Sequence, residues 1–218
     1  GAALLQLWRR VTEGAIHDVA ATLLMTVYCG FLPSFLILIR CDTFPPAPQG
    51  AWLVLLLLAI TKASDIGAYF AGSAIGRHKL IPAISPGKSI EGVVGGLAAS
   101  VGATLLLWYL NILAGGISAP TEARPETVTM GMKASSVLTE ILEVLSHLPV
   151  WQLIVFAIVM SVCGQLGDLL ESVFKRAAGA KDSATLVPVF GGILDMVDSP
   201  VLAAPAAWFL LTYLWGVV

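Results

Sequence analysis

The stretch VAATLLMTVYCGFLPSFLILI, residues 19–39, contains no charged side chain and decides the class of fold. An α-helix rises about 1.5 Å per residue, so this stretch is long enough to cross about 30 Å of hydrocarbon. Pro33 is expected to kink it. Hydrophobic residues make up 57% of the chain and charged residues only 12%, with a mean hydropathy of +0.88. Typical soluble domains have roughly 25% charged residues. The sequence therefore predicts a multi-pass membrane protein.

Four further apolar stretches complete an all-α integral membrane fold with about five transmembrane helices. They run over residues 51–76, 92–112, 150–167 and 200–217. We expect residues 1–18 to form a cytoplasmic N-terminal segment and residues 19–218 to form one multi-pass transmembrane domain that holds the candidate catalytic residues. We interpret the chain as the C-terminal part of a longer protein.

The basic residues predict the orientation. Of the 12 Lys and Arg, eight fall on one side of the predicted membrane, three on the other, and Lys62 lies inside a span. Because loops rich in Lys and Arg face the cytoplasm, the side with eight is cytoplasmic and the protein is expected in the cell membrane. The eight are Arg9, Arg10, Arg77, Lys79, Lys88, Lys175, Arg176 and Lys181.

A dense group of charges follows the fourth span. Asp168, Ser172 and Lys175 have i, i+4, i+7 spacing and share one helical face. A salt-bridged helix end is the structural alternative, since Glu171 and Lys175 are ordinary i, i+4 neighbours. Charge beside hydrocarbon is costly, and further charged residues nearby favour a functional site. These further residues are Arg176, Lys181, Asp182, Asp195 and Asp198, with Gly191 and Gly192 among them.

The residue types in this group suit phosphate chemistry. Asp195 and Asp198 are three residues apart, so on a helix they would provide two carboxylates for a hard divalent cation. The Lys and Arg side chains suit phosphate, and the backbone N–H groups at Gly191-Gly192 can form an anion-binding nest. The sequence therefore predicts phosphate handling at a membrane surface.

Two other places hold charged residues of interest. Asp65 lies inside the second span, three residues after Lys62. It either forms a self-neutralising pair with Lys62 or faces the same aqueous cavity as the other aspartates. The second place, residues 85–92, contains Gly-Lys-Ser but is expected to be a loop and not a nucleotide-binding P-loop. Position 82 is Pro82 where that motif needs glycine, and no strand is expected before it. Lys88 remains a candidate phosphate contact and Glu91 a candidate partner or ligand.

Glycine pairs predict a close contact between helices. Gly72/Gly76 and Gly92/Gly96 both fit the GxxxG pattern, which lets membrane helices approach closely. No chemistry is assigned to them.

Several of these stretches closely resemble the signature of the phosphatidate cytidylyltransferases (CDP-diacylglycerol synthases). The main match is S-x-F-K-R-x4-K-D-x-A-x3-P-x-x-G-G-x-x-D-x-x-D over residues 172–198, extended upstream by G-D-L-x-E-S over residues 167–172. The runs D-I-G-A-Y-F-x-G at 65–72 and S-P-x-K-S-x-E-G at 85–92 are similar to the same family. The resemblance covers residues 59–199.

The resemblance implies an all-helical membrane enzyme that condenses CTP with phosphatidate to give CDP-diacylglycerol and pyrophosphate. The phosphatidate phosphate would attack the α-phosphate of CTP directly, with Mg²⁺ as cofactor and a second cation left open. No nucleic-acid partner is expected, and a homodimer is one option for the oligomeric state. By position, the resemblance implies metal ligands at Asp168, Asp195 and Asp198; catalytic phosphate contacts at Lys175, Arg176 and Lys181, with Asp182 and Ser172; and a substrate cavity at Asp65, Ser85, Lys88, Glu91, Gly191 and Gly192.

Two departures from the family pattern leave the rate and the substrate in question. Phe190 stands where the pattern has His before the double glycine, and Met196 stands where it has Arg. Two alternatives therefore stay open. One is a CTP-dependent lipid-alcohol kinase, and the other is a non-catalytic membrane protein of the same fold.

Overall fold

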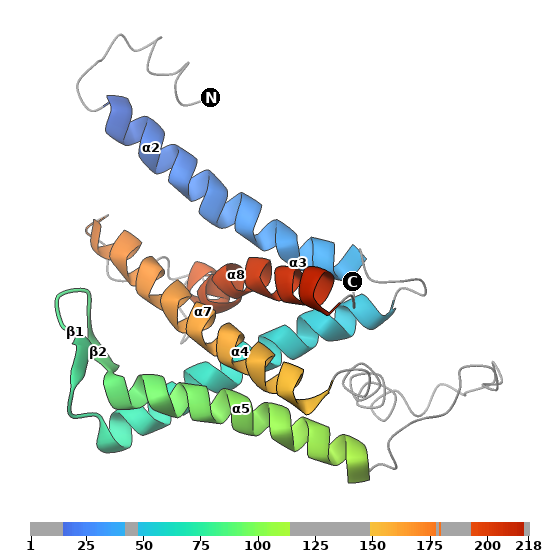
Figure 1. Cartoon of the computed structure of the whole chain (residues 1–218). Helices are drawn as coiled ribbons and strands as arrows, with labels where there is room; N and C mark the ends of the chain where they lie inside the picture. The colour runs from blue at the N-terminus through green and yellow to red at the C-terminus, as the bar shows by residue number, and fades with distance from the viewer. Residues whose placement is uncertain (1–14, 42–47, 114–148, 178, 180–192, 216–218) are drawn as a thin grey trace.

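The computed structural model describes residues 15–41, 48–113, 149–177, 179 and 193–215, and the chain is mostly helical (Figure 1). Among these residues, five helical segments are long and apolar enough to cross a membrane. Each overlaps one predicted span, so the predicted fold class is confirmed. The segments are Ala15–Cys41, Gly50–Ile75, Ile90–Leu110, Val150–Ala177 and Val197–Leu214. The division into two parts at residue 18 stays a prediction.

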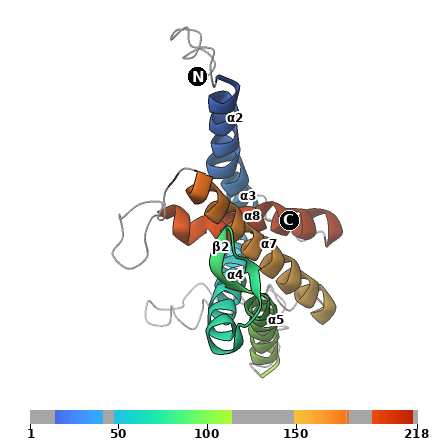
Figure 2. The same ribbon diagram turned by 90° about the vertical axis from the view of Figure 1, so that its left-hand side faces the viewer.

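The first span is interrupted just before Pro33. It consists of helix α2 (Ala15–Thr26), a π-helical turn (Val27–Phe31) and helix α3 (Leu32–Cys41). A proline ring collides with the carbonyl four residues earlier, here Cys29, and a wider π turn relieves that collision. No residue of α2 is buried, and the helix extends away from the other helices (Figures 1 and 2).

The remaining spans are helices α4 (Pro48–Ile75), α5 (Ile90–Leu113), α7 (Val150–Ala177) and α8 (Ile193–Phe209), with a π-helical turn (Leu210–Leu214) after α8. The fifth span was expected to start near Pro200; the apolar segment begins at Val197 and the helix itself earlier, at Ile193. Pro200 and Pro205 lie inside α8. Neighbouring helices and local backbone adjustments make prolines tolerable within membrane helices.

A β-hairpin joins α4 to α5, where a loop without strands was expected. Strand β1 (Lys79–Ile81) pairs antiparallel with strand β2 (Ser85–Ser89), and Lys79 lies opposite Ser89. The expectation that no strand precedes the Gly87-Lys88-Ser89 run was therefore wrong, since β1 precedes it. The Gly87-Lys88-Ser89 run lies within β2, so its backbone pairs with β1 and does not form a phosphate-binding loop.

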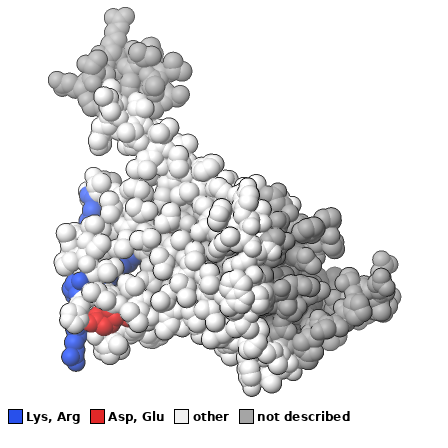
Figure 3. Space-filling model, viewed as in Figure 1, with Lys and Arg blue, Asp and Glu red and all other residues white. Residues whose placement is uncertain are grey.

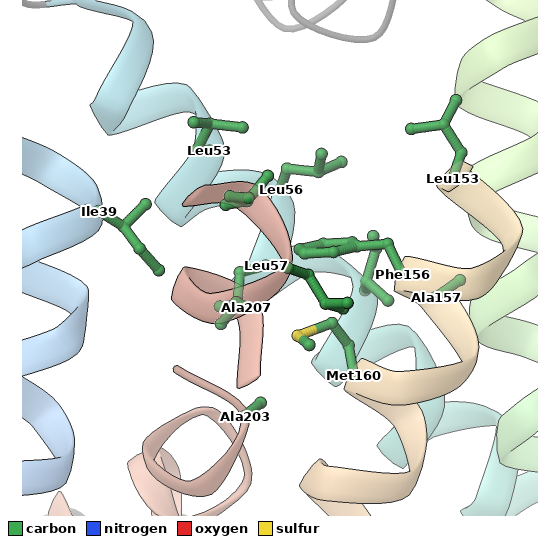
Figure 4. Packing of buried hydrophobic residues seen from close by; sticks show 13 residues of the cluster. Ile39, Leu53, Leu56, Leu57, Leu153, Phe156, Ala157, Met160, Ala203 and Ala207 are labelled. Atoms are coloured by element: carbon green, nitrogen blue, oxygen red, sulfur yellow. The ribbon is translucent and has the colours of Figure 1, made fainter. Parts of the chain in front are cut away.

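The core lies where α4, α7 and α8 meet. Leu57 of α4 and Phe156 and Met160 of α7 are almost completely buried, and the small residues Ala203 and Ala207 of α8 let α8 pack closely against them (Figure 4). This apolar cluster fixes the relative positions of the three helices.

Small residues hold α4 against α5. A Cβ atom on Gly67 would collide with Ala99, and one on Gly95 would collide with Ala71. A Cβ on Gly92 would lie 3.0 Å from the Ala68 carbonyl oxygen and 3.5 Å from the Cα of Gly72. The close packing predicted from the glycine pattern is confirmed.

Charge is unevenly distributed over the surface. On the face shown in Figure 3, the Lys, Arg, Asp and Glu side chains gather along the edge where the hairpin lies. The rest of the described surface on this face is uncharged. This distribution suits a helix bundle whose body lies in hydrocarbon and whose charged end meets water.

Candidate functional site

The buried hydroxyl of Ser199 connects three aspartates from three helices. Ser199 Oγ lies 2.6 Å from Asp168 Oδ1 on α7, 3.1 Å from Asp65 Oδ2 on α4 and 3.4 Å from Asp198 Oδ1 on α8. The backbone N–H of Ser199 also donates to Asp198 Oδ1 at 2.7 Å. One hydroxyl has one proton to donate, so the shortest contact, to Asp168, is the natural hydrogen bond. We call Asp65, Asp168, Asp198 and Ser199 the carboxylate cluster.

Two lysines neutralise part of this cluster. Lys62 Nζ lies 2.8 Å from Asp65 Oδ2, and Lys88 Nζ lies 3.3 Å from Asp168 Oδ2. Asp65 therefore combines the two predicted alternatives. It pairs with Lys62, and it also lines a cavity together with Asp168. Carboxylates held this close repel one another, and two lysines leave one of the three uncompensated. The cluster is therefore suited to binding additional positive charge.

A cavity of about 640 Å³ opens beside the cluster. It is formed by α4, α5, α7 and the hairpin. At one end it is polar, with Asp65, Lys88 and Asp168. Its other walls are mostly apolar and include Tyr69, Leu80, Ile81, Val162 and Leu166. The cavity thus has a charged end and an apolar body, which matches a ligand with a charged head and an apolar tail.

Close packing of α7 on α8 brings the aspartates together. A Cβ atom on Gly167 would lie 2.5 Å from the backbone oxygen of Asp198 and 3.3 Å from the Cα of Ser199. Only a residue without a side chain fits between the two backbones here. Gly167 therefore lets Asp168 and Ser199 meet.

A polar network around Gln165, which also lines the cavity, ties α4, α5 and α7 together. Gln165 Nε2 donates to Ser161 Oγ at 3.1 Å, to Ser64 Oγ at 3.3 Å and to the Val93 carbonyl at 3.3 Å. Ser64 Oγ and Ser161 Oγ are 2.7 Å apart. Polar groups buried among apolar helices are stable only when bonded, so this network fixes the register of the three helices.

Glu91 anchors the hairpin and does not line the cavity. Its carboxylate accepts the backbone N–H groups of Arg77 and His78, each at 3.2 Å, and lies 2.6 Å from His78 Nδ1. Ser85 begins β2 opposite Ile81 and is also not among the cavity-lining residues. Their predicted roles in substrate binding stay predictions.

The end of α7 holds the next group of predicted residues. Ser172 Oγ donates to the Asp168 carbonyl at 2.8 Å, within the same helix. Lys175 Nζ lies 3.2 Å from Glu171 Oε2, the i, i+4 pair expected of a salt-bridged helix end. Arg176 is exposed one residue further on. The catalytic roles predicted for Ser172, Lys175 and Arg176 remain predictions.

Some predicted residues lie outside the described part of the chain. These are Lys181, Asp182, Gly191 and Gly192, together with the departure at Phe190. Asp195 and Met196 lie in α8, but their side chains are outside the described residues. On the helix, Asp195 precedes Asp198 by three residues, so the two share a face.

Two site residues were not predicted from the sequence. Ser199 directly follows Asp198, and its position next to that aspartate was the only available signal. Gln165 is a polar residue inside an apolar span, which is a weak signal that a membrane helix faces protein and not lipid.

Comparison with known proteins gives the family. The cytidylyltransferase family model matches residues 2–214, so the chain belongs to the cytidylyltransferase family. Phosphatidate cytidylyltransferase from Brucella suis is 36% identical over 191 residues, which cover 88% of this chain and 55% of the relative. The enzyme of the same name from Staphylococcus haemolyticus is 32% identical over 195 residues, 89% of this chain and 59% of the relative.

A third relative has no assigned activity. Uncharacterized protein YnbB from Escherichia coli is 30% identical over 204 residues, 92% of this chain and 56% of the relative. The chain spans between half and three fifths of the length of these relatives. The resemblance predicted from the signature runs is confirmed at the level of the family.

Proposed function

We propose that this protein transfers CMP from CTP to phosphatidate, giving CDP-diacylglycerol and pyrophosphate, as a nucleotidyltransferase of phospholipid biosynthesis. The observation that supports this most is the carboxylate cluster with its two lysines, at the charged end of an otherwise apolar cavity. Membership of the cytidylyltransferase family supplies the reaction class. The positive-inside rule supports a cell-membrane location with this site facing the cytoplasm, where CTP is available.

Mg²⁺ is the cofactor we propose. Mg²⁺ prefers oxygen ligands, and carboxylate oxygens of Asp65, Asp168 and Asp198 all lie within 3.4 Å of the Ser199 hydroxyl. Among the described residues, no three acidic, His or Cys side chains form a ready-made metal site. The donor chemistry nevertheless fits Mg²⁺, and Asp168, Asp195 and Asp198 would hold it. When bound, Mg²⁺ would neutralise phosphate charge, and a second cation is left open.

The reaction balances as a direct displacement. A phosphate oxygen of phosphatidate forms a bond to the α-phosphorus of CTP. The bond from that phosphorus to the oxygen bridging the α- and β-phosphates breaks, and pyrophosphate leaves with the electron pair. Lys88 would orient a phosphate beside Asp168, and Lys175 and Arg176 would hold others. Catalysis would then rest on positioning and on neutralisation of charge.

Release of pyrophosphate tests the function. We expect the full-length protein in liposomes to release pyrophosphate from CTP only when both phosphatidate and Mg²⁺ are present. Phosphatidate-independent release of CDP would instead support a kinase acting on another lipid. Absence of any nucleotide turnover by the folded protein would support the non-catalytic alternative.

Ser199→Ala is expected to lower kcat/KM for CMP transfer by about 10- to 100-fold, as for other groups that orient metal-binding carboxylates. The variant removes the hydroxyl that lies between Asp65 and Asp168 and leaves their charges in place. Activity would be measured over a range of Mg²⁺ concentrations. The midpoint, the Mg²⁺ concentration that gives half-maximal activity, should be higher than in wild type. Ser34→Ala is the control, since the Ser34 hydroxyl bonds the Phe31 carbonyl of its own span and Ser34 does not line the cavity. An unchanged midpoint in Ser199→Ala would contradict the proposed orienting role.

The acyl chain of phosphatidate is proposed to lie along the apolar wall of the cavity. Tyr69 is 72% exposed, Leu166 48% and Val162 46%, so the cavity is open along these side chains. Val162 lies about 18 Å from the start of α7 and about 22 Å from its end, at the depth of hydrocarbon. An opening at this depth gives access from the lipid.

Leu166→Trp is expected to raise KM for long-chain phosphatidate by about tenfold, because the larger ring fills the apolar wall. KM for CTP and for dibutyryl phosphatidate should stay within about twofold of wild type. Val155→Trp is the matched control, since Val155 lies on the same helix, is partly exposed and does not line the cavity. Equal KM changes for short-chain and long-chain lipid would refute the acyl-chain assignment.

A further inference from the structure

Tyr28 is a buried tyrosine whose hydroxyl has no hydrogen-bond partner among the described residues. It lies in the π-helical turn of the first span and is 3% exposed. Its hydroxyl oxygen is inaccessible to solvent and is not bonded by any described group. Burying an unpaired hydroxyl is destabilising, so packing alone does not explain a tyrosine at this position.

The polar end of Tyr28 lies beside the candidate site. Its ring packs edge-on against Phe174 of α7, with ring centroids 5.1 Å apart. Phe174 follows Glu171 by three residues and Asp168 by six, so the ring of Tyr28 lies against the segment of α7 that carries both carboxylates. The tyrosine thus approaches the carboxylate cluster from the first span, on the part of α7 that bears Glu171 and Lys175.

The π-helical turn explains how this placement arises. Residues of α2, immediately before the turn, are not buried, and Tyr28 is the one buried residue of the turn. A π turn contains one residue more than an α turn and so redirects the side chains within it, which is why such turns are frequent at functional sites. Here the redirected side chain is the one that reaches the site.

The chemistry of the group indicates what it binds. A phenol donates one hydrogen bond, and phosphate oxygens are strong acceptors. Two other buried groups without a described partner, Trp208 Nε1 and Thr212 Oγ1, belong to the last part of the fifth span, about 13 Å or more along the helix from Ser199. Of these three residues, Tyr28 is the one whose ring contacts α7 just beyond Asp168 and Glu171.

We propose that the Tyr28 hydroxyl donates a hydrogen bond to a phosphate oxygen of a substrate held at the carboxylate cluster. The proposal rests on the proposed function, and it adds a contact from the first span to a site otherwise built by α4, α7 and α8. The phosphate belongs either to the lipid or to the nucleotide, and the two sources are separated by experiment.

Tyr28→Phe removes the hydroxyl and keeps the ring against Phe174. We expect kcat/KM for CMP transfer to fall about 10- to 100-fold, the loss typical of one hydrogen bond to a charged group. A larger KM for phosphatidate with unchanged KM for CTP assigns the bond to the lipid phosphate. The reverse pattern assigns it to the nucleotide, and a fall in kcat alone assigns it to the transition state.

Thermal stability of the ligand-free protein in detergent provides the second readout. Because no described residue bonds the hydroxyl in the absence of ligand, Tyr28→Phe should melt at the wild-type temperature or above it. Tyr213→Phe is the matched control, because Tyr213 also lies in a π-helical turn but is 67% exposed. Loss of its hydroxyl should change neither kcat/KM for CMP transfer nor the melting temperature. A lowered melting temperature, or full activity in Tyr28→Phe, would overturn the proposal.

A binding measurement separates this proposal from the proposed function. Inorganic pyrophosphate with Mg²⁺, CTP with Mg²⁺, and dibutyryl phosphatidate would each be tested for raising the melting temperature. At least one should stabilise wild type more than Tyr28→Phe, even if no CMP transfer is found. Equal stabilisation of both proteins by all three probes would refute the Tyr28 contact, whereas wild-type protein without CMP transfer would refute only the proposed function.

Discussion

Asp168→Asn is expected to lower the rate of CMP transfer by about 100- to 1,000-fold, the cost of removing one preorganised electrostatic group. Asp168 makes the shortest contact with Ser199 in the cluster, since it accepts the hydroxyl at 2.6 Å, and it also pairs with Lys88 at 3.3 Å. Asparagine keeps the shape and one acceptor oxygen but removes the charge. The measurement is kcat in liposomes at saturating CTP and phosphatidate.

Two comparisons make this result specific. Asp18→Asn removes the same charge from α2, a helix with no buried residue, and should leave kcat unchanged. Raising the Mg²⁺ concentration should not restore the rate of CMP transfer in Asp168→Asn, because the substitution removes a proposed Mg²⁺ ligand and does not merely misalign it. Recovery to near wild-type activity at high Mg²⁺ would show that Asp168 is dispensable for catalysis.

Gly167→Ala is expected to lower CMP transfer by about 100-fold, the cost of moving a catalytic group by roughly 1 Å. The added Cβ would lie 2.5 Å from the backbone oxygen of Asp198, and a backbone atom cannot rotate away as a side chain can. α7 and α8 must therefore separate where Asp168 meets Ser199. We also expect a loss of about 1–3 kcal/mol in stability from overpacking, seen as a lower melting temperature.

Gly102→Ala is the matched control for this variant. Gly102 also lies in a membrane helix, α5, and a Cβ there would meet nothing within 4 Å. Alanine favours helix over glycine, so this variant should be as stable as wild type or slightly more stable. If Gly167→Ala behaves like Gly102→Ala in both measurements, the close α7–α8 contact is not needed for the site.

The helices could be predicted from the sequence because hydrocarbon imposes a simple requirement on every span. Each needs about 20 apolar residues, and residues 19–39 meet that requirement without a single charge. The rule does not give helix ends, so it did not predict that α8 begins at Ile193 and not near Pro200. It also does not reveal short strands, so the hairpin over residues 79–89 was missed.

The site was predictable only in part. Asp168 and Asp198 could be found because charges in an apolar chain stand out and match a known signature. That Asp65 joins them depends on a contact with Ser199 between residues 134 positions apart in the sequence. The same holds for Tyr28, whose meeting with Phe174 of α7 depends on how the first span packs. For Glu91 the sequence left a role as partner or ligand open, and its bonds to the backbone of Arg77 and His78 became visible only in the structure.

Transfer of label from CTP into lipid distinguishes CMP transfer from the alternatives. The full-length protein would be incubated in liposomes with phosphatidate, Mg²⁺ and CTP labelled in separate reactions at the α- and the γ-phosphate. We expect the α label to enter the lipid as CDP-diacylglycerol while the γ label leaves as pyrophosphate, and both rates to fall about 100- to 1,000-fold in Asp168→Asn. Entry of the γ label into lipid, or transfer of neither label by the folded wild-type protein, would contradict the proposed CMP transfer.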